Sequence, residues 1–186
     1  MKVIYLHGFN SDENSHTGTG LLKDFPDLIK FSYNYINSDK GYNEIKSVVE
    51  NTLKIDTDII LVGTSLGGFW ANYFGQKYGL KVVLANPSIN PSETLKRYLG
   101  ENINYGSGKA ETLTMDDVAD YKKYEVENIA KNQKFIVLGM KDEIVDYRKT
   151  SQIFKNKADI TYVDEGHQIN PKTLSEIVKL ASNLYV

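Results

Sequence analysis

Residues 59–70 read IILVGTSLGGFW, an apolar run that predicts a strand, then the pattern G-x-S-x-G, then helical spacing. This order is typical of a serine held on a sharp turn between a strand and a helix. Such a turn is crowded, and Gly63 and Gly67 put small residues two positions before and after Ser65. The amide of Leu66 then lies at a helix start, where partial positive charge favours an oxyanion. The stretch predicts a nucleophilic Ser65, and the competing interpretation is a glycine-rich turn with an incidental serine.

Similar apolar runs, each bounded by turn residues, predict further strands at 3–6, 28–35, 82–85, 135–138 and 160–163. Between them, apolar residues spaced three and four apart predict amphipathic helices, as at 45–53 and 174–181. Strands without internal alternation that are separated by helices are typical of a mostly parallel sheet covered on both faces. The fold class is therefore α/β, a three-layer doubly wound fold.

Residues 91–131 interrupt this alternation with Ser, Asn, Gly, charged residues and several tyrosines, and show no clear strand. We expect a small helical cap or excursion there, within a single domain spanning residues 1–186. Tyr105, Tyr121 and Tyr124 could line a substrate pocket, or they could be ordinary half-buried packing residues.

Composition limits the partners and the chemistry. The chain has 186 residues, 41% of them hydrophobic, and its 22 basic and 24 acidic residues are scattered, so no basic stripe predicts a nucleic acid or membrane partner. Cysteine is absent, which excludes disulfides and thiolate catalysis. The first apolar run is too short for a signal peptide and no segment reaches the length of a membrane span, so we expect a cytoplasmic protein.

No cofactor or metal is expected from the motifs. Gly18-Thr19-Gly20 lacks the third glycine of a dinucleotide fingerprint, and no phosphate-binding loop pattern occurs. Three isolated histidines without cysteine do not match the spacing of a zinc site.

A serine nucleophile needs a base, and the only histidines are His7, His16 and His167. His167 follows the last predicted strand, in a loop that should open at the same sheet edge as Ser65. It also follows Ser65 in the chain, as the base does in α/β-hydrolases, whereas the other two histidines precede it. His16 lies in a polar loop and is interpreted as a solvated histidine or a substrate contact.

The loop after the first predicted strand contains His7-Gly8-Phe9. An oxyanion hole needs a second backbone donor from a neighbouring loop, and the amide of Phe9 can supply it, with Gly8 allowing the turn. We expect His7 to hold the loop rather than to move protons. The alternative is a strand-ending turn without a catalytic role.

The acid that orients the base should follow a strand between Ser65 and His167, and Asp142 and Glu143 both do. We favour Asp142 because its shorter side chain at the loop apex can accept the imidazole Nδ1 proton. Asp146 is a further alternative, although it is also a candidate cap for a helix that begins near Tyr147.

Residues 4–11, 63–69, 85–87, 142–148 and 166–167 together resemble the YqiA/YcfP-like esterases, small bacterial α/β-hydrolases. The resemblance implies a carboxylesterase that cleaves short or medium acyl esters, or thioesters, with Ser65, Asp142 and His167 as the catalytic triad. Its partner would be a small-molecule ester. Residues 104–106 depart from the Asn-Pro-Tyr of that family, which bears on substrate preference. Other acyl transfer and a weakly active binding module are the alternative functions.

Overall fold

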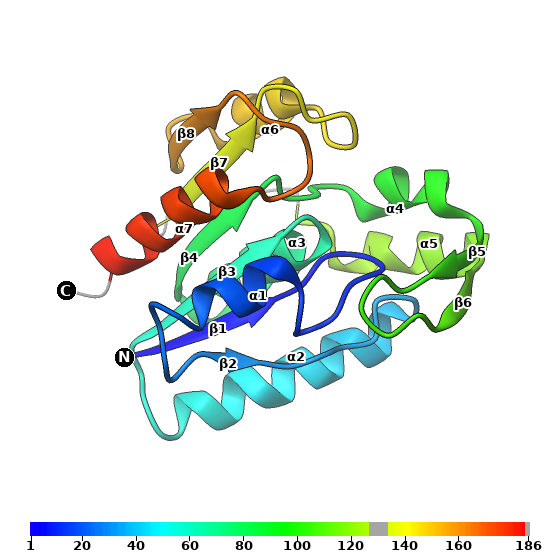
Figure 1. Cartoon of the computed structure of the whole chain (residues 1–186). Coiled ribbons are helices and arrows are strands. Elements are labelled where there is room, and N and C mark those ends of the chain that lie inside the picture. Colours follow the sequence, from blue (N-terminus) through cyan, green and yellow to red (C-terminus); the bar gives the residue numbers. More distant parts are fainter. Residues whose placement is uncertain (127–133, 185–186) are drawn as a thin grey trace.

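The computed structural model describes residues 1–126 and 134–184. Within them six parallel strands form one sheet in the order β2-β1-β3-β4-β7-β8 (Figure 1). The strands are β1 (Lys2–Leu6), β2 (Ile29–Lys30), β3 (Ile59–Thr64), β4 (Lys81–Ala85), β7 (Lys134–Gly139) and β8 (Asp159–Val163). All six predicted strands are confirmed, but the one predicted at 28–35 pairs over two residues only. Beyond Lys30 the chain leaves the sheet to bury Tyr33 and Tyr35 in the core.

Helices cover both faces of the sheet, and the predicted three-layer α/β fold is confirmed (Figure 1). Successive strand residues point to opposite faces. Ile60 and Val62 pack in one hydrophobic cluster with residues of α1 and α7, whereas Ile59 and Leu61 pack in the other with residues of α2, α3 and α6. The helices are α1 (His16–Leu21), α2 (Ser38–Leu53), α3 (Leu66–Tyr78), α6 (Tyr147–Phe154) and α7 (Pro171–Asn183).

The excursion after β4 is not purely helical, so the prediction of no strand in residues 91–131 is wrong. It contains a two-stranded antiparallel hairpin. The two strands are mostly exposed and have no alternating apolar pattern, which is why the sequence does not reveal them. Its elements are α4 (Pro91–Thr94), η1 (Leu95–Tyr98), β5 (Gly100–Ile103), β6 (Ala110–Leu113), α5 (Met115–Asp120) and η2 (Tyr121–Tyr124). Residues 127–131 of the predicted cap lie outside the described residues.

The excursion and the loops that follow β1, β3, β7 and β8 lie at the carboxyl end of the parallel strands (Figure 1). This is the edge at which ligands bind in open α/β sheets. In the part of the chain that is described, no helix is long and apolar enough to cross a bilayer.

Candidate active site

Ser65 lies between β3 and α3 with φ of 53° and ψ of −118°, in the positive-φ region that non-glycine residues avoid. The backbone of this turn packs closely against itself and against the loop after β1. A Cβ at residue 67 would lie 2.0 Å from the carbonyl oxygen of Leu6, and one at residue 63 would lie 2.2 Å from that of Gly67. Backbone contacts therefore require glycine at both predicted positions. These contacts hold Ser65 at the carboxyl end of β3.

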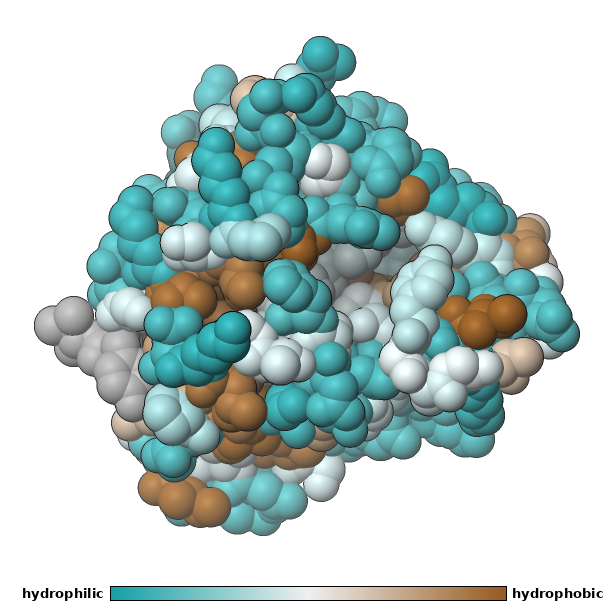
Figure 2. Space-filling view, in the orientation of Figure 1, coloured by the Kyte–Doolittle hydropathy of each residue, from teal (hydrophilic) through white to brown (hydrophobic). Residues whose placement is uncertain are grey.

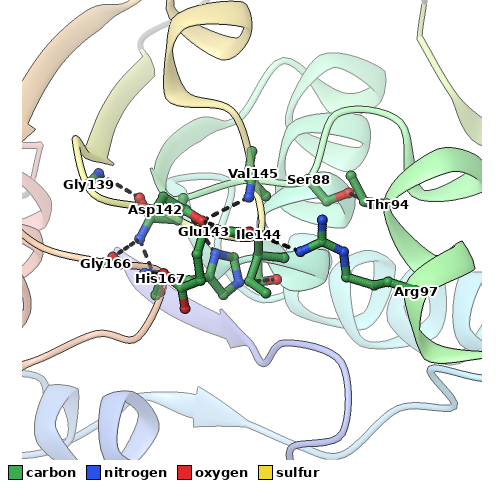
Figure 3. Close-up of polar contacts among 12 residues, drawn as sticks. Ser88, Thr94, Arg97, Gly139, Asp142, Glu143, Ile144, Val145, Gly166 and His167 are labelled. Atoms are coloured by element: carbon green, nitrogen blue, oxygen red, sulfur yellow. Dashed lines mark hydrogen bonds and ion pairs between the residues drawn. The ribbon is translucent and has the colours of Figure 1, made fainter.

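The structure brings the three predicted catalytic residues together. Nε2 of His167 lies 2.9 Å from Oγ of Ser65, and Nδ1 of His167 lies 2.8 Å from Oδ2 of Asp142. The side chain of Asp142 is 1% exposed and that of His167 is 15% exposed, so solvent reaches the ring but not the carboxylate. Figure 3 shows Asp142 and His167 converging from the loops after β7 and β8.

The neighbouring carboxylates have other partners. The second oxygen of Asp142 accepts hydrogen bonds from the amides of Ile144 and Val145, each at 2.8 Å, which holds the carboxylate in place. Glu143 accepts the backbone amide of His167 at 3.2 Å and does not bond its ring. Asp146 caps α6 by accepting the amide of Arg148, as the capping alternative predicted. Of the three candidate acids, Asp142 alone bonds the imidazole in the described residues.

The loop after β1 lies against the nucleophile. A Cβ at residue 8 would stand 3.3 Å from Cβ of Ser65, so Gly8 lets the backbone approach the serine closely. Both predicted oxyanion residues line the cavity beside Ser65, Phe9 from this loop and Leu66 as the first residue of α3. The first amides of a helix have no partner within it, which leaves that of Leu66 available to an anion.

His7 is fully buried and belongs to the scaffold of that loop. Its Nδ1 lies 2.8 Å from the carbonyl oxygen of Gly8, and its Nε2 accepts the amide of Tyr33 at 3.3 Å. The Tyr33 ring stacks on the imidazole, and its hydroxyl donates to the carbonyl of His7 at 2.6 Å. Burial lowers the pKa of His7, so the ring is neutral and donates from Nδ1.

A cavity of about 720 Å³ opens above Ser65. The space-filling view is hollowed on the side of the molecule that carries the β5–β6 hairpin (Figure 2). Tyr105 lines this cavity and is 82% exposed, and the exposed His16 lines it too. Tyr121 is buried and donates to the carbonyl of Tyr35, and Tyr124 packs against Trp70, so these two tyrosines are packing residues.

Sequence reasoning missed a role for Asn86, which directly follows β4. It is 2% exposed, has a φ of 44°, and its side chain bonds the loop that carries His167. Two signals in the sequence point to it: its place at the carboxyl end of a predicted strand, and its place within residues 85–87 of the family resemblance. In residues 1–126 and 134–184, no group of three or more metal-ligating side chains is gathered, and no residue set is assigned to a cofactor.

A family model described as "Uncharacterised protein family (UPF0227)" matches residues 2–181. The chain belongs to the UPF0227 family. This family includes YqiA and YcfP, so the resemblance inferred from the sequence is confirmed. A UPF0227 protein of Vibrio cholerae strain El Tor Inaba N16961 is 28% identical over 170 residues, covering 87% of each chain. A UPF0227 protein of Shewanella woodyi is 23% identical over 182 residues, covering 96% of each chain.

Solved structures with the same fold include several α/β-hydrolases. Mouse alpha/beta hydrolase domain-containing protein 10 aligns with a TM-score of 0.75 at 16% identity, covering 99% of this UPF0227 chain and 89% of its own. Est1E from Butyrivibrio proteoclasticus aligns with a TM-score of 0.74 at 18% identity, covering 99% and 88%. At these identities the likeness establishes the fold.

Proposed function

We propose that this UPF0227 protein is a serine hydrolase that cleaves carboxylic esters through an acyl-serine intermediate. The observation that carries the proposal is the continuous hydrogen-bonded chain from Ser65 through His167 to Asp142, with distances of 2.9 and 2.8 Å. A nucleophile within reach of a base that is itself oriented by a buried acid is the arrangement required for acyl transfer. The fold neighbours support hydrolysis, since they include an esterase and a monoacylglycerol lipase.

The proposed reaction follows from the positions of the hydrogen-bonding atoms. Asp142 accepts the Nδ1 proton of His167, which leaves Nε2 free to take the proton of Ser65 as Oγ attacks the acyl carbon. The Leu66 amide at the start of α3 and the Phe9 amide would hold the oxyanion. His167 then gives the proton to the leaving alcohol as the ester C–O bond breaks. In the second half Nε2 of His167 takes a proton from water as the water oxygen attacks the acyl carbon. The bond to Oγ of Ser65 then breaks, the carboxylic acid leaves and His167 returns the proton to Oγ.

The cavity supports a neutral ester of modest size. Its volume of about 720 Å³ is in the usual range for small-molecule sites. Phe9, Leu95 and Tyr98 give part of its wall an apolar character suited to a short or medium acyl chain. Within the described chain its lining includes the carboxylates of Asp12 and Glu143 and no lysine or arginine, which favours an uncharged substrate over an anionic one.

The nucleophile is tested with wild type, Ser65→Ala and Ser88→Ala. Ser88 also lines the cavity, but its hydroxyl bonds Thr94 at 2.7 Å, which makes it a matched serine control. We expect wild type and Ser88→Ala to react with a fluorophosphonate and to hydrolyse a p-nitrophenyl ester series from acetate to decanoate. Ser65→Ala should lose labelling and at least about a thousandfold in turnover. Equal labelling of Ser65→Ala and wild type would refute the assignment.

The base is tested with His167→Ala and His16→Ala under the same assays. We expect the first to abolish turnover and the second to leave kcat within a few-fold, because His16 lies at the exposed rim. Inactivation by His16→Ala, with turnover retained by His167→Ala, would contradict the proposal.

A further inference from the structure

The turn at residues 85–88, directly after β4, contacts the backbone of the nucleophile on both sides. The amide of Ser65 donates to the carbonyl of Ala85 at 3.0 Å, and the carbonyl of Ser65 accepts the amide of Ser88 at 3.0 Å. A serine held in a strained conformation persists only where its surroundings fix it. This turn therefore supports the elbow from the next strand of the sheet.

The side chain of Asn86, in the middle of the same turn, reaches the other half of the site. Its Nδ2 donates to the carbonyls of Gly166 and His167 at 3.1 and 3.0 Å, and its Oδ1 accepts the amide of Gly139 at 2.8 Å. Gly139 is the last residue of β7, three positions before Asp142. One buried amide thus ties the histidine loop to the strand that presents the acid.

The peptide groups of His167 are held on both flanks. Asn86 binds its carbonyl oxygen, and Glu143 accepts its amide hydrogen at 3.2 Å. Residues 164–170 form no helix or strand, and one backbone bond, from the amide of Lys141 to the carbonyl of Glu165 at 2.9 Å, holds the start of this loop. At His167 itself the bonds from Asn86 and Glu143 help to set where the imidazole lies. A displacement of about 1 Å in a catalytic group can cost 100-fold in rate.

We propose that Asn86 is a positioning residue that fixes the separation of Ser65 and His167. This inference rests on the proposed function of the same three catalytic residues. Asparagine suits the position for two reasons. It tolerates the positive φ of 44° better than other side chains, and its amide can donate twice while accepting once. Aspartate would keep the acceptor for Gly139 but would face two carbonyl oxygens without a proton to donate.

The variant that isolates the side chain is Asn86→Gly, because glycine accepts the positive φ without strain. Its matched control is Asn156→Gly, an exposed asparagine with a φ of 63° just after α6. We expect Asn86→Gly to lower kcat by about 100-fold with KM within about threefold, and to slow fluorophosphonate labelling in the same proportion. Asn156→Gly should match wild type in all three measurements.

Asn86→Asp is a second variant, which keeps the side-chain volume and the bond to Gly139 but loses both donors. We expect a comparable fall in kcat and a lower melting temperature, because a buried carboxylate then faces two carbonyl oxygens. A general loss of stability would move the melting temperature and the active fraction together. A positioning role predicts a fall in kcat per folded molecule. The number of folded molecules is measured by the final extent of fluorophosphonate labelling.

A readout independent of turnover is the low-field proton NMR resonance expected for the hydrogen between His167 Nδ1 and Asp142. Wild type and Asn156→Gly should show it, and Asn86→Gly should broaden or lose it at the same temperature. Unchanged kcat, labelling and resonance in both Asn86 variants would overturn the positioning role while Ser65-dependent hydrolysis stands. Absence of Ser65-dependent labelling in wild type would overturn the proposed function instead, and the resonance would still test Asn86.

Discussion

The elbow around Ser65 and the β5–β6 hairpin both border the cavity, yet different forces hold them. The elbow is fixed by backbone-to-backbone contacts that exclude a single extra carbon at residues 63 and 67. The hairpin is attached through hydrogen bonds: Asn102 Oδ1 accepts Nδ2 of the buried Asn10 at 3.2 Å, and Nδ2 of the buried Asn104 donates to the carbonyl of Ser11 at 2.9 Å. The amide of Tyr105 also donates to the carbonyl of Asn10 at 2.8 Å. A backbone overlap cannot be relieved by turning a side chain, whereas each of these side-chain hydrogen bonds can be removed by one substitution. We therefore expect substitutions at the elbow to affect the catalytic step, and substitutions on the hairpin to affect which substrates bind in the cavity.

The largest effect is expected from Gly67→Ala, which tests the close backbone contacts at the elbow. Its Cβ would overlap the carbonyl oxygen of Leu6, and backbone atoms cannot rotate away as a side chain can. We expect a loss of about 3 kcal/mol or more in unfolding free energy and no fluorophosphonate labelling of the folded fraction. Urea denaturation and labelling measure the two. Gly108→Ala, in the hairpin turn, is the comparison, because no atom lies within 4 Å of its added Cβ and only its φ of 70° is strained. We expect it to cost about 1–2 kcal/mol and to keep full labelling, so that backbone strain is separated from overlap.

A smaller effect on stability, but a large one on rate, is expected from Asp142→Asn. The amide keeps the shape but can stabilise the wrong tautomer of His167, and in a comparable site this costs roughly 10,000-fold in kcat. Glu143→Gln, whose side chain can still accept the His167 amide, should cost less than about tenfold. Steady-state kinetics on one p-nitrophenyl ester compares them, and a Glu143→Gln loss equal to that of Asp142→Asn would reverse the assignment of the acid.

The loop beside the elbow contains the buried His7, which should make the unfolding free energy depend on pH. Burial lowers the folded-state pKa of His7 below 6.5, so the unfolded chain binds a proton that the folded chain does not. Its contribution is complete above pH 6.5 and is lost as pH falls, by at most about 1.4 kcal/mol per pH unit. His7→Gln should show a flatter decline in unfolding free energy between pH 6.5 and 5 than wild type. An identical slope in the two proteins would contradict a neutral His7.

The smallest effect is expected from Tyr105→Ala at the hairpin. The ring is 82% exposed and lines the cavity mouth, so its loss should leave melting temperature and fluorophosphonate labelling unchanged. We expect KM to rise a few-fold for decanoate but not for acetate. Ile103→Ala, 58% exposed on the same hairpin and outside the cavity lining, is the control. A uniform fall in kcat for both esters would place Tyr105 in the chemistry rather than at the rim.

The same contrast explains what sequence could predict. The elbow, the sheet and the histidine loop follow from local patterns, because a G-x-S-x-G turn and buried apolar strands constrain their own neighbours. The hairpin and Asn86 depend on partners distant in the chain, as with the 92 positions that separate Asn10 from Asn102. Side-chain length alone favours Asp142 over Glu143 in the sequence. In the structure the amides of Ile144 and Val145 orient the Asp142 carboxylate, which sequence reasoning does not predict.

The strands and α7 run in opposite directions, and this has a practical consequence. The amino group of Met1 pairs with Asp56, and the carbonyl of Leu184, the last described residue, accepts Nζ of Lys81 at the start of β4. Met1 and the end of α7 therefore lie at the amino edge of the sheet, on the side away from the excursion (Figure 1). A support, a tag or a fused protein attached at Met1 would face away from the cavity mouth, so an immobilised form should keep its full access to substrate.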